Sequence, residues 1–322
     1  MMKNYIPTIN ISSLLKSNFN SRSATNTLKK IEQACVEVGF FQVTGHGIDI
    51  KKIDNICKIG DKFFNSSEKN KKKLAPKKWN KKNKNVYRGY FPNSVNGKEG
   101  LDLGDLKITT KNLMKYKSPF IEYLDLNRSF KPSSIKSLSK YFDNIFSLSE
   151  ILFMGIIKLY KKDVSISKRA FSRLKTLSTL RFNYYPNQTK PVEISEQDGV
   201  ALGCETHVDS GVFTVLYQDK KGGLQVQNRK NKKWYDVPFN KNALIVNTGL
   251  TLEYLSKGKF KATNHRVLWN KTKRMSVPFF FEPSYDFMMH TSFLNSSNTN
   301  KKGIFFQDFL KNSLKKFIEY QR

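Results

Sequence analysis

The second half of the chain is dominated by short strand-like runs with turn residues between them, and this pattern constrains the fold most. Turn signals fall at Lys221-Gly222-Gly223 and at residues 228–233. Many short strands at regular spacing are typical of a β-sandwich or a jelly-roll barrel. The expected strands are 178–185, 205–217, 224–228, 234–237, 243–247, 263–269 and 274–281.

Helices dominate the chain before this region. Apolar side chains between Leu28 and Val38 recur at the spacing of one helix face, and residues 40–43 then read as a strand. Further helices are expected over 53–63, within 137–160 and, as an amphipathic C-terminal helix, over 304–320. The expected fold class is therefore α+β, with a jelly-roll core, flanking N-terminal helices and a C-terminal helix.

The formal net charge of +31 is typical of proteins that bind polyanions. However, the chain has 47 Lys and only 10 Arg, alongside 29 Asn, which is the bias of an AT-rich genome. The densest run, residues 69–84, contains nine Lys, no Arg and one aromatic residue, Trp79. The run therefore has no arginine to bind phosphates and only one aromatic side chain to stack on bases. We interpret it as a solvated loop. A basic protein that binds nucleic acid or an anionic surface is the distant alternative.

The cysteines and the apolar segments indicate the compartment. The chain has three cysteines, Cys35, Cys57 and Cys204. Because their number is odd and no pair has metal-ligand spacing, no disulfide framework is expected. The N-terminus lacks the apolar stretch of a signal peptide. The most apolar segment, 145–160, is interrupted by polar residues and too short to span a bilayer. We expect a cytoplasmic protein without a membrane segment.

Histidine is scarce in this chain. Of its four histidines, one stands two residues before an aspartate and another opens an expected strand. His207 and Asp209 are two residues apart on an expected strand, so their side chains share a face. His265 opens a later expected strand. Two imidazoles and one carboxylate form the facial triad of non-haem Fe(II) oxygenases, which leaves three coordination positions open. The alternative is a surface His-x-Asp pair that binds nothing.

A candidate carboxylate receptor follows the last of these ligands. Arg274 and Ser276 share a face of an expected strand nine residues after His265. A guanidinium makes two charge-assisted hydrogen bonds to a carboxylate, and a hydroxyl adds a third. The alternative is a surface arginine with a hydroxyl nearby.

Several motifs in order resemble the isopenicillin N synthase-like (iron/ascorbate-dependent oxidoreductase) branch of the Fe(II)- and 2-oxoglutarate-dependent dioxygenase superfamily. The resemblance covers nearly the whole chain. It rests on residues 6–10 (IPTIN), 37–48 (EVGFFQVTGHGI), 87–92 (YRGYFP), 98–104 (KEGLDLG), 183–186 (NYYP), 223–226 (GLQV), Trp234 and 264–267 (NHRV).

The resemblance implies a double-stranded β-helix, the jelly-roll fold that cupins share. It implies that the iron ligands are His207, Asp209 and His265. It implies that the distal carboxylate of 2-oxoglutarate is held by Arg274 and Ser276, and that the cosubstrate also receives hydrogen bonds from Tyr185 and Asn183. We divide the chain into an N-terminal non-haem dioxygenase region (1–125), connecting helices (126–175), the jelly-roll core (176–285) and a C-terminal helical segment (286–322).

The activity implied is that of a dioxygenase with Fe(II) as metal, 2-oxoglutarate as cosubstrate and ascorbate as an optional reductant. It would hydroxylate, desaturate or cyclise a small organic substrate, while 2-oxoglutarate and O2 become succinate and CO2. The nearest alternative is an Fe(II) oxidase like isopenicillin N synthase, which does not use 2-oxoglutarate and whose Arg-x-Ser pair holds a substrate carboxylate. The identity of the substrate and the oligomeric state stay open.

Two residues near the first ligand carry separate expectations. Cys204 stands three residues before His207, so on an unbroken strand it faces away from the metal, and we expect it to pack in the core. Glu205 shares the parity of His207, but we expect it to face solvent at a bend.

Overall fold

The computed structural model describes residues 5–16, 19–92, 97–116, 118–187, 190–291, 293–294 and 303–315. The strands are β1 (Thr8–Asn10), β2 (Phe40–Thr44), β3 (Gly89–Phe91), β4 (Glu99–Leu103), β5 (Thr179–Tyr185), β6 (Glu193–Ile194), β7 (Ala201–His207), β8 (Phe213–Gln218), β9 (Leu224–Gln227), β10 (Trp234–Asp236), β11 (Leu244–Thr248), β12 (His265–Leu268), β13 (Arg274–Phe281), β14 (Met288–Met289) and β15 (Ile304–Phe305). The helices are α1 (Ser12–Lys16), α2 (Arg22–Glu37), α3 (Ile50–Phe64), α4 (Glu68–Lys72), α5 (Thr110–Lys115), α6 (Pro132–Leu159), α7 (Ser165–Ala170), α8 (Leu250–Leu255) and α9 (Phe306–Leu314), with a 3₁₀ turn at Leu126–Arg128.

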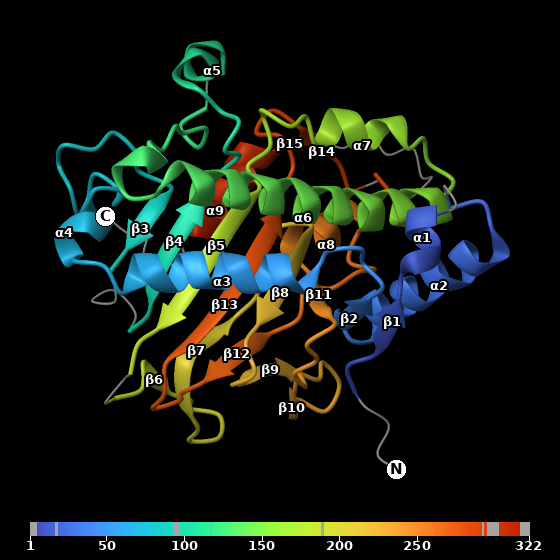
Figure 1. Cartoon of the computed structure of the whole chain (residues 1–322). Helices are drawn as coiled ribbons and strands as arrows, with labels where there is room; N and C mark the ends of the chain where they lie inside the picture. Colours follow the sequence, from blue (N-terminus) through green and yellow to red (C-terminus); the bar gives the residue numbers. More distant parts are fainter. Residues whose placement is uncertain are drawn as a thin grey trace.

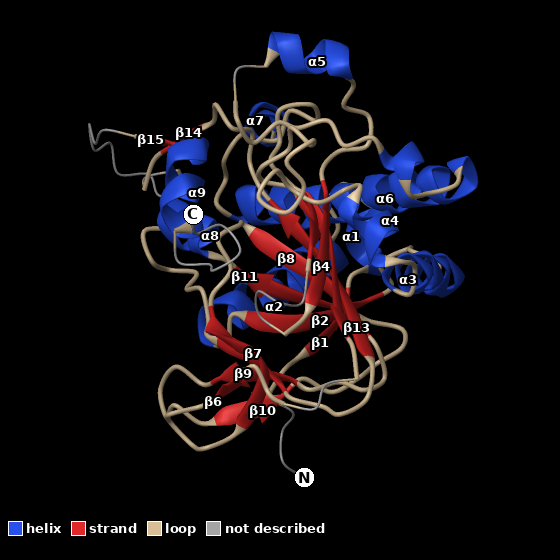
Figure 2. Cartoon of the chain, turned by 90° about the vertical axis from the view of Figure 1, so that its left-hand side faces the viewer, coloured by secondary structure: helices blue, strands red, loops and turns tan. Residues whose placement is uncertain are grey.

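Most of these strands form two sheets that face each other. The larger sheet has the order β1-β2-β11-β8-β13-β5-β4-β3, and the smaller has the order β10-β9-β12-β7-β6. In Figure 2 the strands β6, β7, β9 and β10 of the smaller sheet lie below those of the larger one. The α+β class and the jelly-roll core expected from the sequence are confirmed.

The alternation of side chains along the larger sheet separates two cores. On β11, Leu244 and Val246 pack with the helices, whereas Ile245 between them packs with the smaller sheet. Successive side chains of a strand point to opposite faces, so a strand that is apolar throughout can fill both cores. The barrel interior therefore lies between the two sheets, with Val226 and Val267 facing it from the smaller one.

Two long helices cover the outer face of the larger sheet. In Figure 1, α3 and α6 lie side by side in front of β5, β8 and β13. The contact is largely aromatic: Phe142 meets Phe279 edge-on with ring centroids 5.1 Å apart, and Phe146 meets Phe281 at 5.4 Å. No helix among the described residues is long and apolar enough to cross a membrane.

The expectation of a single strand over 205–217 is wrong. The chain leaves the smaller sheet after His207, crosses over and enters the larger sheet at Phe213. Residues 208–212 form this crossover, in which the Thr251 N–H group donates to the carbonyls of Ser210 and Gly211. The residues on both sides of the crossover have a strand-like composition, so the sequence did not reveal the change of sheet. The expected C-terminal helix, 304–320, is present as α9 over Phe306–Leu314; its expected residues 316–320 lie outside the described part.

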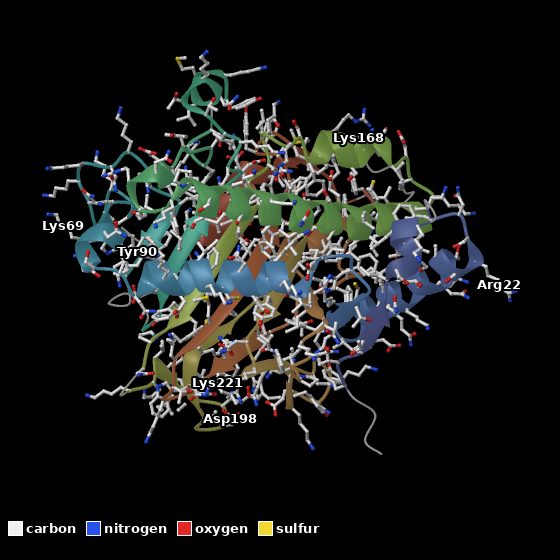
Figure 3. All side chains as sticks on the ribbon, in the orientation of Figure 1. Arg22, Lys69, Tyr90, Lys168, Asp198 and Lys221 are labelled. Carbon is white, nitrogen blue, oxygen red and sulfur yellow. The ribbon has the colours of Figure 1, made fainter. Side chains whose placement is uncertain are left out.

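We expected the lysine-rich run 69–84 to be a solvated loop, but this expectation holds for only part of the run. It begins inside α4, and Lys71 is buried there. Its ammonium lies 2.5 Å from Glu99 Oε2, and the Tyr90 hydroxyl donates to the same oxygen at 2.6 Å. Lys69 lies at the outer edge of the molecule in Figure 3, as expected for most of the run. The ion pair of Lys71 with Glu99 thus attaches the run to the larger sheet.

Candidate metal centre

The side chains of His207, Asp209 and His265 converge on one point. His207 ends β7 and lies directly opposite His265, the first residue of β12, while Asp209 lies in the crossover that follows β7. The Nε2 atoms of His207 and His265 are 3.8 Å and 3.6 Å from Asp209 Oδ1. All three ligand atoms lie within 4.8 Å of one another, which is the donor set expected from the sequence. Asp209 reaches this point from a loop, not from the expected strand.

Backbone carbonyls fix the orientation of both imidazoles. The Nδ1 atom of His207 lies 2.8 Å from the Glu205 carbonyl, and that of His265 lies 3.2 Å from the Thr263 carbonyl. A carbonyl only accepts, so each Nδ1 carries the proton and each Nε2 offers a lone pair. Both rings therefore present a metal-binding nitrogen toward Asp209, as histidine ligands do.

Two neutral donors orient the carboxylate. Asp209 Oδ2 accepts hydrogen bonds from Thr214 Oγ1 at 2.6 Å and from Asn247 Nδ2 at 2.8 Å. Burial by itself raises the pKa of Asp209, but the two imidazoles and these two donors outweigh it and lower the pKa. The carboxylate is therefore held ionised, with Oδ1 left for a cation. Neither Thr214 nor Asn247 was identified from the sequence.

Irregular pairing brings Cys204 next to the first ligand. His265 lies opposite His207 and Val267 lies opposite Cys204, so the two strands advance by different numbers of residues between these pairs. Such a β-bulge inverts the side-chain alternation. Burial lowers the pKa of His207, but the Cys204 sulfur beside it outweighs this and raises the pKa to about 9. The expectation that Cys204 faces away from the ligands is wrong, although the thiol is buried as expected. Glu205 is exposed.

The four expected cosubstrate residues lie together on two neighbouring strands. Across the β13–β5 ladder, Arg274 lies opposite Tyr185 and Ser276 lies opposite Asn183. The Arg274 guanidinium stands 4.8 Å from the centroid of the Tyr185 ring, and its Nε donates to the Gly222 carbonyl at 2.6 Å. Both side chains are buried. The ladder thus presents a cation, a hydroxyl, a phenol and an amide on one face.

This cluster contains buried polar atoms without partners. Arg274 Nη1, Asn183 Oδ1 and Gln218 Oε1 form no hydrogen bond within the described structure. Gln218 belongs to the cluster because it lies opposite Ser276 on β8, a pairing that the sequence did not reveal. No described acidic side chain is bonded to Arg274. A buried guanidinium without an anion is costly, so the cluster fits a carboxylate ligand.

The triad and the β5–β13 cluster face the same interior. Cys204 affects the pKa of both His207 and Tyr185, and so does Lys98, whose ammonium lies 2.9 Å from the Cys204 sulfur. Tyr185 and Cys204 also belong to one buried apolar cluster between the two sheets. A ligand that bridged the metal and Arg274 would therefore lie inside the barrel.

A cavity adjoins the triad. It is lined by Tyr87, Asp102, Thr179, Arg181, His207, Asp209, Ser210, Phe280, Glu282 and Leu314. Arg181 donates to both carboxylate oxygens of Asp102, from Nε and Nη2, each at 2.6 Å. Two residues of the triad thus form part of the wall, so a molecule in this cavity would lie next to a metal held there.

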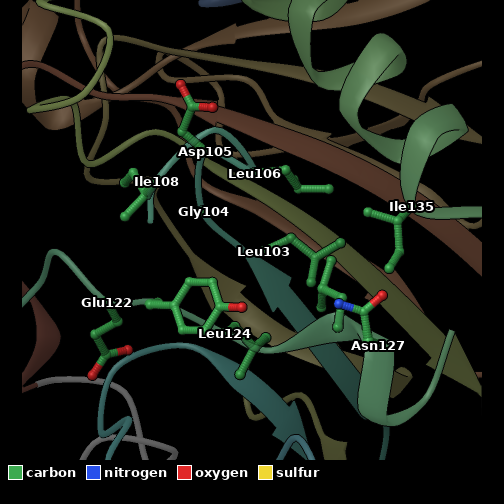
Figure 4. Close-up of a pocket in the computed structure, with 11 residues that line it drawn as sticks. Leu103, Gly104, Asp105, Leu106, Ile108, Glu122, Leu124, Asn127 and Ile135 are labelled. Atoms are coloured by element: carbon green, nitrogen blue, oxygen red, sulfur yellow. The ribbon is translucent and has the colours of Figure 1, made fainter. Parts of the chain in front are cut away.

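A further pocket, shown in Figure 4, carries no comparable chemistry. Its wall includes Asp105 and Glu122. Asp105 is ion-paired with Arg173, and Glu122 accepts from the backbone N–H groups of Val86, Tyr87 and Arg88. Its acidic groups are therefore used to hold loops together.

Two family models match the chain. The model described as the 2OG-Fe(II) oxygenase superfamily matches residues 176–283. The model described as non-haem dioxygenase in morphine synthesis N-terminal matches residues 6–147. The first match contains all three triad residues and the four residues of the β5–β13 cluster.

Individual proteins match over most of their length. A "probable iron/ascorbate oxidoreductase" of Dictyostelium discoideum is 31% identical over 287 residues, covering 80% of this chain and 76% of that protein. Isopenicillin N synthase of Streptomyces griseus is 28% identical over 299 residues, covering 90% and 88%. The structure of the dioxygenase for auxin oxidation 1 of Arabidopsis thaliana with 2-oxoglutarate has a TM-score of 0.70 at 21% identity, covering 90% of this chain and 98% of that one.

Proposed function

This chain belongs to the 2OG-Fe(II) oxygenase superfamily, and we propose that it oxidises a small organic substrate at a metal held by His207, Asp209 and His265. It is an oxidoreductase of the dioxygenase class that uses Fe(II) and 2-oxoglutarate. The observation that carries the assignment of the residues is the convergence of their three ligand atoms within 4.8 Å, beside a cavity.

The three ligands would perform their task through preset protonation states. In each neutral imidazole Nδ1 carries the proton and Nε2 is available to a metal, which would displace the second proton that His207 retains because of its raised pKa. Asp209 presents Oδ1 while Thr214 and Asn247 occupy its other oxygen. Two imidazoles and a carboxylate suit Fe(II) and leave positions open for exogenous ligands. When bound, Fe(II) supplies the activation of O2 that oxidises the substrate, with 2-oxoglutarate converted to succinate and CO2.

The β5–β13 cluster would bind and orient the cosubstrate. Arg274 would offer its unpartnered Nη1 to the distal carboxylate, with Ser276 donating beside it. Tyr185 and Asn183, opposite them on β5, would complete the hydrogen bonds. A charge-assisted fork fixes both the position and the angle of a carboxylate, which orients the other end of the molecule toward the metal.

The apolar lining of the barrel would exclude water from this site. Phe40 packs edge-on against His265, with centroids 5.3 Å apart, and belongs to a buried apolar cluster with Leu216, Val226 and Ile245. Exclusion of water strengthens the ionic contacts within the site and prevents side reactions.

The direct test is succinate release by the purified protein with Fe(II), 2-oxoglutarate and candidate substrates. We expect the release to require both additions and to be lost in Asp209→Ala. Full metal-dependent turnover in that variant would show that the ligand assignment is wrong.

An oxidase that does not use 2-oxoglutarate is the second candidate, because several relatives are isopenicillin N synthases at 26–28% identity. In that case Arg274 and Ser276 would hold a carboxylate of the substrate itself. The two functions differ in one measurement, the dependence of O2 consumption on added 2-oxoglutarate. We expect that dependence to be strict.

We also propose the setting in which the enzyme works. The segments 1–125, 126–175, 176–285 and 286–322 would act as one catalytic unit in the cytoplasm, where a reducing environment suits three free cysteines. Its partners would be a small molecule and O2, without a specific nucleic acid.

A further inference from the structure

The cavity beside the triad contains one acidic group that the proposed chemistry does not use. Glu282 follows β13 directly, lines the cavity and is only 3% exposed. Its Oε1 accepts a hydrogen bond from Ser210 Oγ at 3.3 Å, and its Oε2 has no partner within the described structure. Buried carboxyl oxygens are normally paired, so an unpaired one in a cavity wall marks a place for a ligand donor.

The charges around the cavity favour a cation in that place. Asp102 and Arg181 neutralise each other through two hydrogen bonds, and Asp209 is committed to the metal triad. The carboxyl of Glu282 is then the remaining acidic group of the lining, and no described basic side chain forms an ion pair with it. Arg88 is the cation that most affects it, but the hydrogen bonds described for that guanidinium go to backbone carbonyls and a hydroxyl.

The remainder of the lining is suited to an apolar body. Phe280 lies two residues before Glu282 on the same face of β13, Leu314 comes from α9, and Tyr87 adds a buried ring. Ser210, which contacts Glu282, directly follows the ligand Asp209. Because Glu282, His207 and Asp209 line the same cavity, a small molecule in it would lie near both the Glu282 carboxyl and a metal held by the triad.

We propose that Glu282 anchors the substrate, and that the substrate is a small amine whose ammonium or N–H group binds its free carboxyl oxygen while its apolar part lies against Phe280 and Leu314 near the metal. This inference rests on the proposed function, since the same cavity would hold the molecule that is oxidised. It assigns the charge of that molecule.

The test is equilibrium binding, so that it does not depend on turnover. The Fe(II)-loaded protein is kept anaerobic with 2-oxoglutarate, and binding of three probes is followed by the broadening of their NMR lines near the paramagnetic metal. The probes are benzylamine, benzyl alcohol and benzoate, which share a ring and differ in the end group. At about pH 8.5, where the carboxyl of Glu282 has lost its proton, we expect benzylamine to bind at least about tenfold more tightly than the other two, as a hydrogen bond to a charged group implies.

The matched variants are Glu282→Gln, which keeps the size of the side chain, and Glu193→Gln on β6, where the carboxylate is exposed. We expect Glu282→Gln to weaken benzylamine binding about tenfold or more, and Glu193→Gln to leave it unchanged. Equal binding of the three probes to the wild-type protein, or unchanged benzylamine binding in Glu282→Gln, would overturn the proposal. Failure of 2-oxoglutarate itself to bind the Fe(II) protein would instead contradict the proposed function.

Discussion

Asn247 Nδ2 donates to Asp209 Oδ2 at 2.8 Å, across 38 residues of sequence. This bond, with the one from Thr214, determines which carboxylate oxygen faces the imidazoles. The metal centre therefore depends on β11 and β8 as well as on the strands that carry its histidines.

Removal of this support should weaken metal binding without removing a ligand. We expect Asn247→Ala to lower the affinity for Fe(II) by about 10- to 100-fold, the usual effect of losing a hydrogen bond to a metal ligand. Metal titration under anaerobic conditions measures this directly. Asn242→Ala is the control, because Asn242 lies exposed just before β11. Unchanged affinity in Asn247→Ala would show that Thr214 alone orients the carboxylate.

Binding of 2-oxoglutarate should stabilise the fold through Arg274. A ligand that binds only the native state raises the midpoint of thermal unfolding. We expect such a rise in the wild-type protein with Fe(II), and its loss in Arg274→Met, because the buried guanidinium has no anion of its own. Thermal melts with and without 2-oxoglutarate provide the measurement. The control is Arg229→Met, at an arginine that is partly buried and outside the β5–β13 cluster. A full rise in Arg274→Met would place the carboxylate elsewhere.

Glu282 should make the stability fall as the pH rises. Burial raises its pKa from 4.5 to about 8. Between these values the unfolded chain releases a proton that the folded chain retains, so rising pH favours unfolding until about pH 8. We expect Glu282→Gln to melt close to the wild type near pH 5 and at a higher temperature near pH 8. A difference between the two proteins that is independent of pH would contradict the raised pKa.

The buried pair of Lys71 and Glu99 should be important for stability. Removal of one partner leaves a buried charge, which typically costs about 3–5 kcal/mol. We expect Lys71→Met to lower the free energy of unfolding by this order, and the double variant with Glu99→Gln to recover most of the loss. Lys69→Met, on the exposed side of the same helix, should change the free energy by about 0.5 kcal/mol or less. Chemical denaturation measures all three.

Local patterns were sufficient to identify most strands of the core and the three side chains that converge in the candidate metal centre. Strand composition depends on neighbours in the sequence, and His207, Asp209 and His265 stand out because histidine is rare. The β5–β13 cluster followed from side-chain alternation, which holds on an unbroken strand.

Features that depend on distant partners could not be predicted. The crossover at 208–212 exists because β7 and β8 pair in different sheets, and the bulge beside Cys204 exists because β12 sets the register. The burial of Lys71 requires Glu99, which comes 28 residues later. Asn247 and Glu282 carry no local signal, since each acquires its role only when the barrel closes around Asp209 and Ser210.

The cavity wall combines Leu314, at the end of α9, with side chains of the barrel strands. The residues proposed to hold the metal and those proposed to touch the substrate thus come partly from separate parts of the chain. Mutation of the C-terminal helix would therefore alter which molecules are accepted while leaving the oxidation machinery intact. Change at Leu314 would therefore offer a route to new substrates that leaves the triad in place.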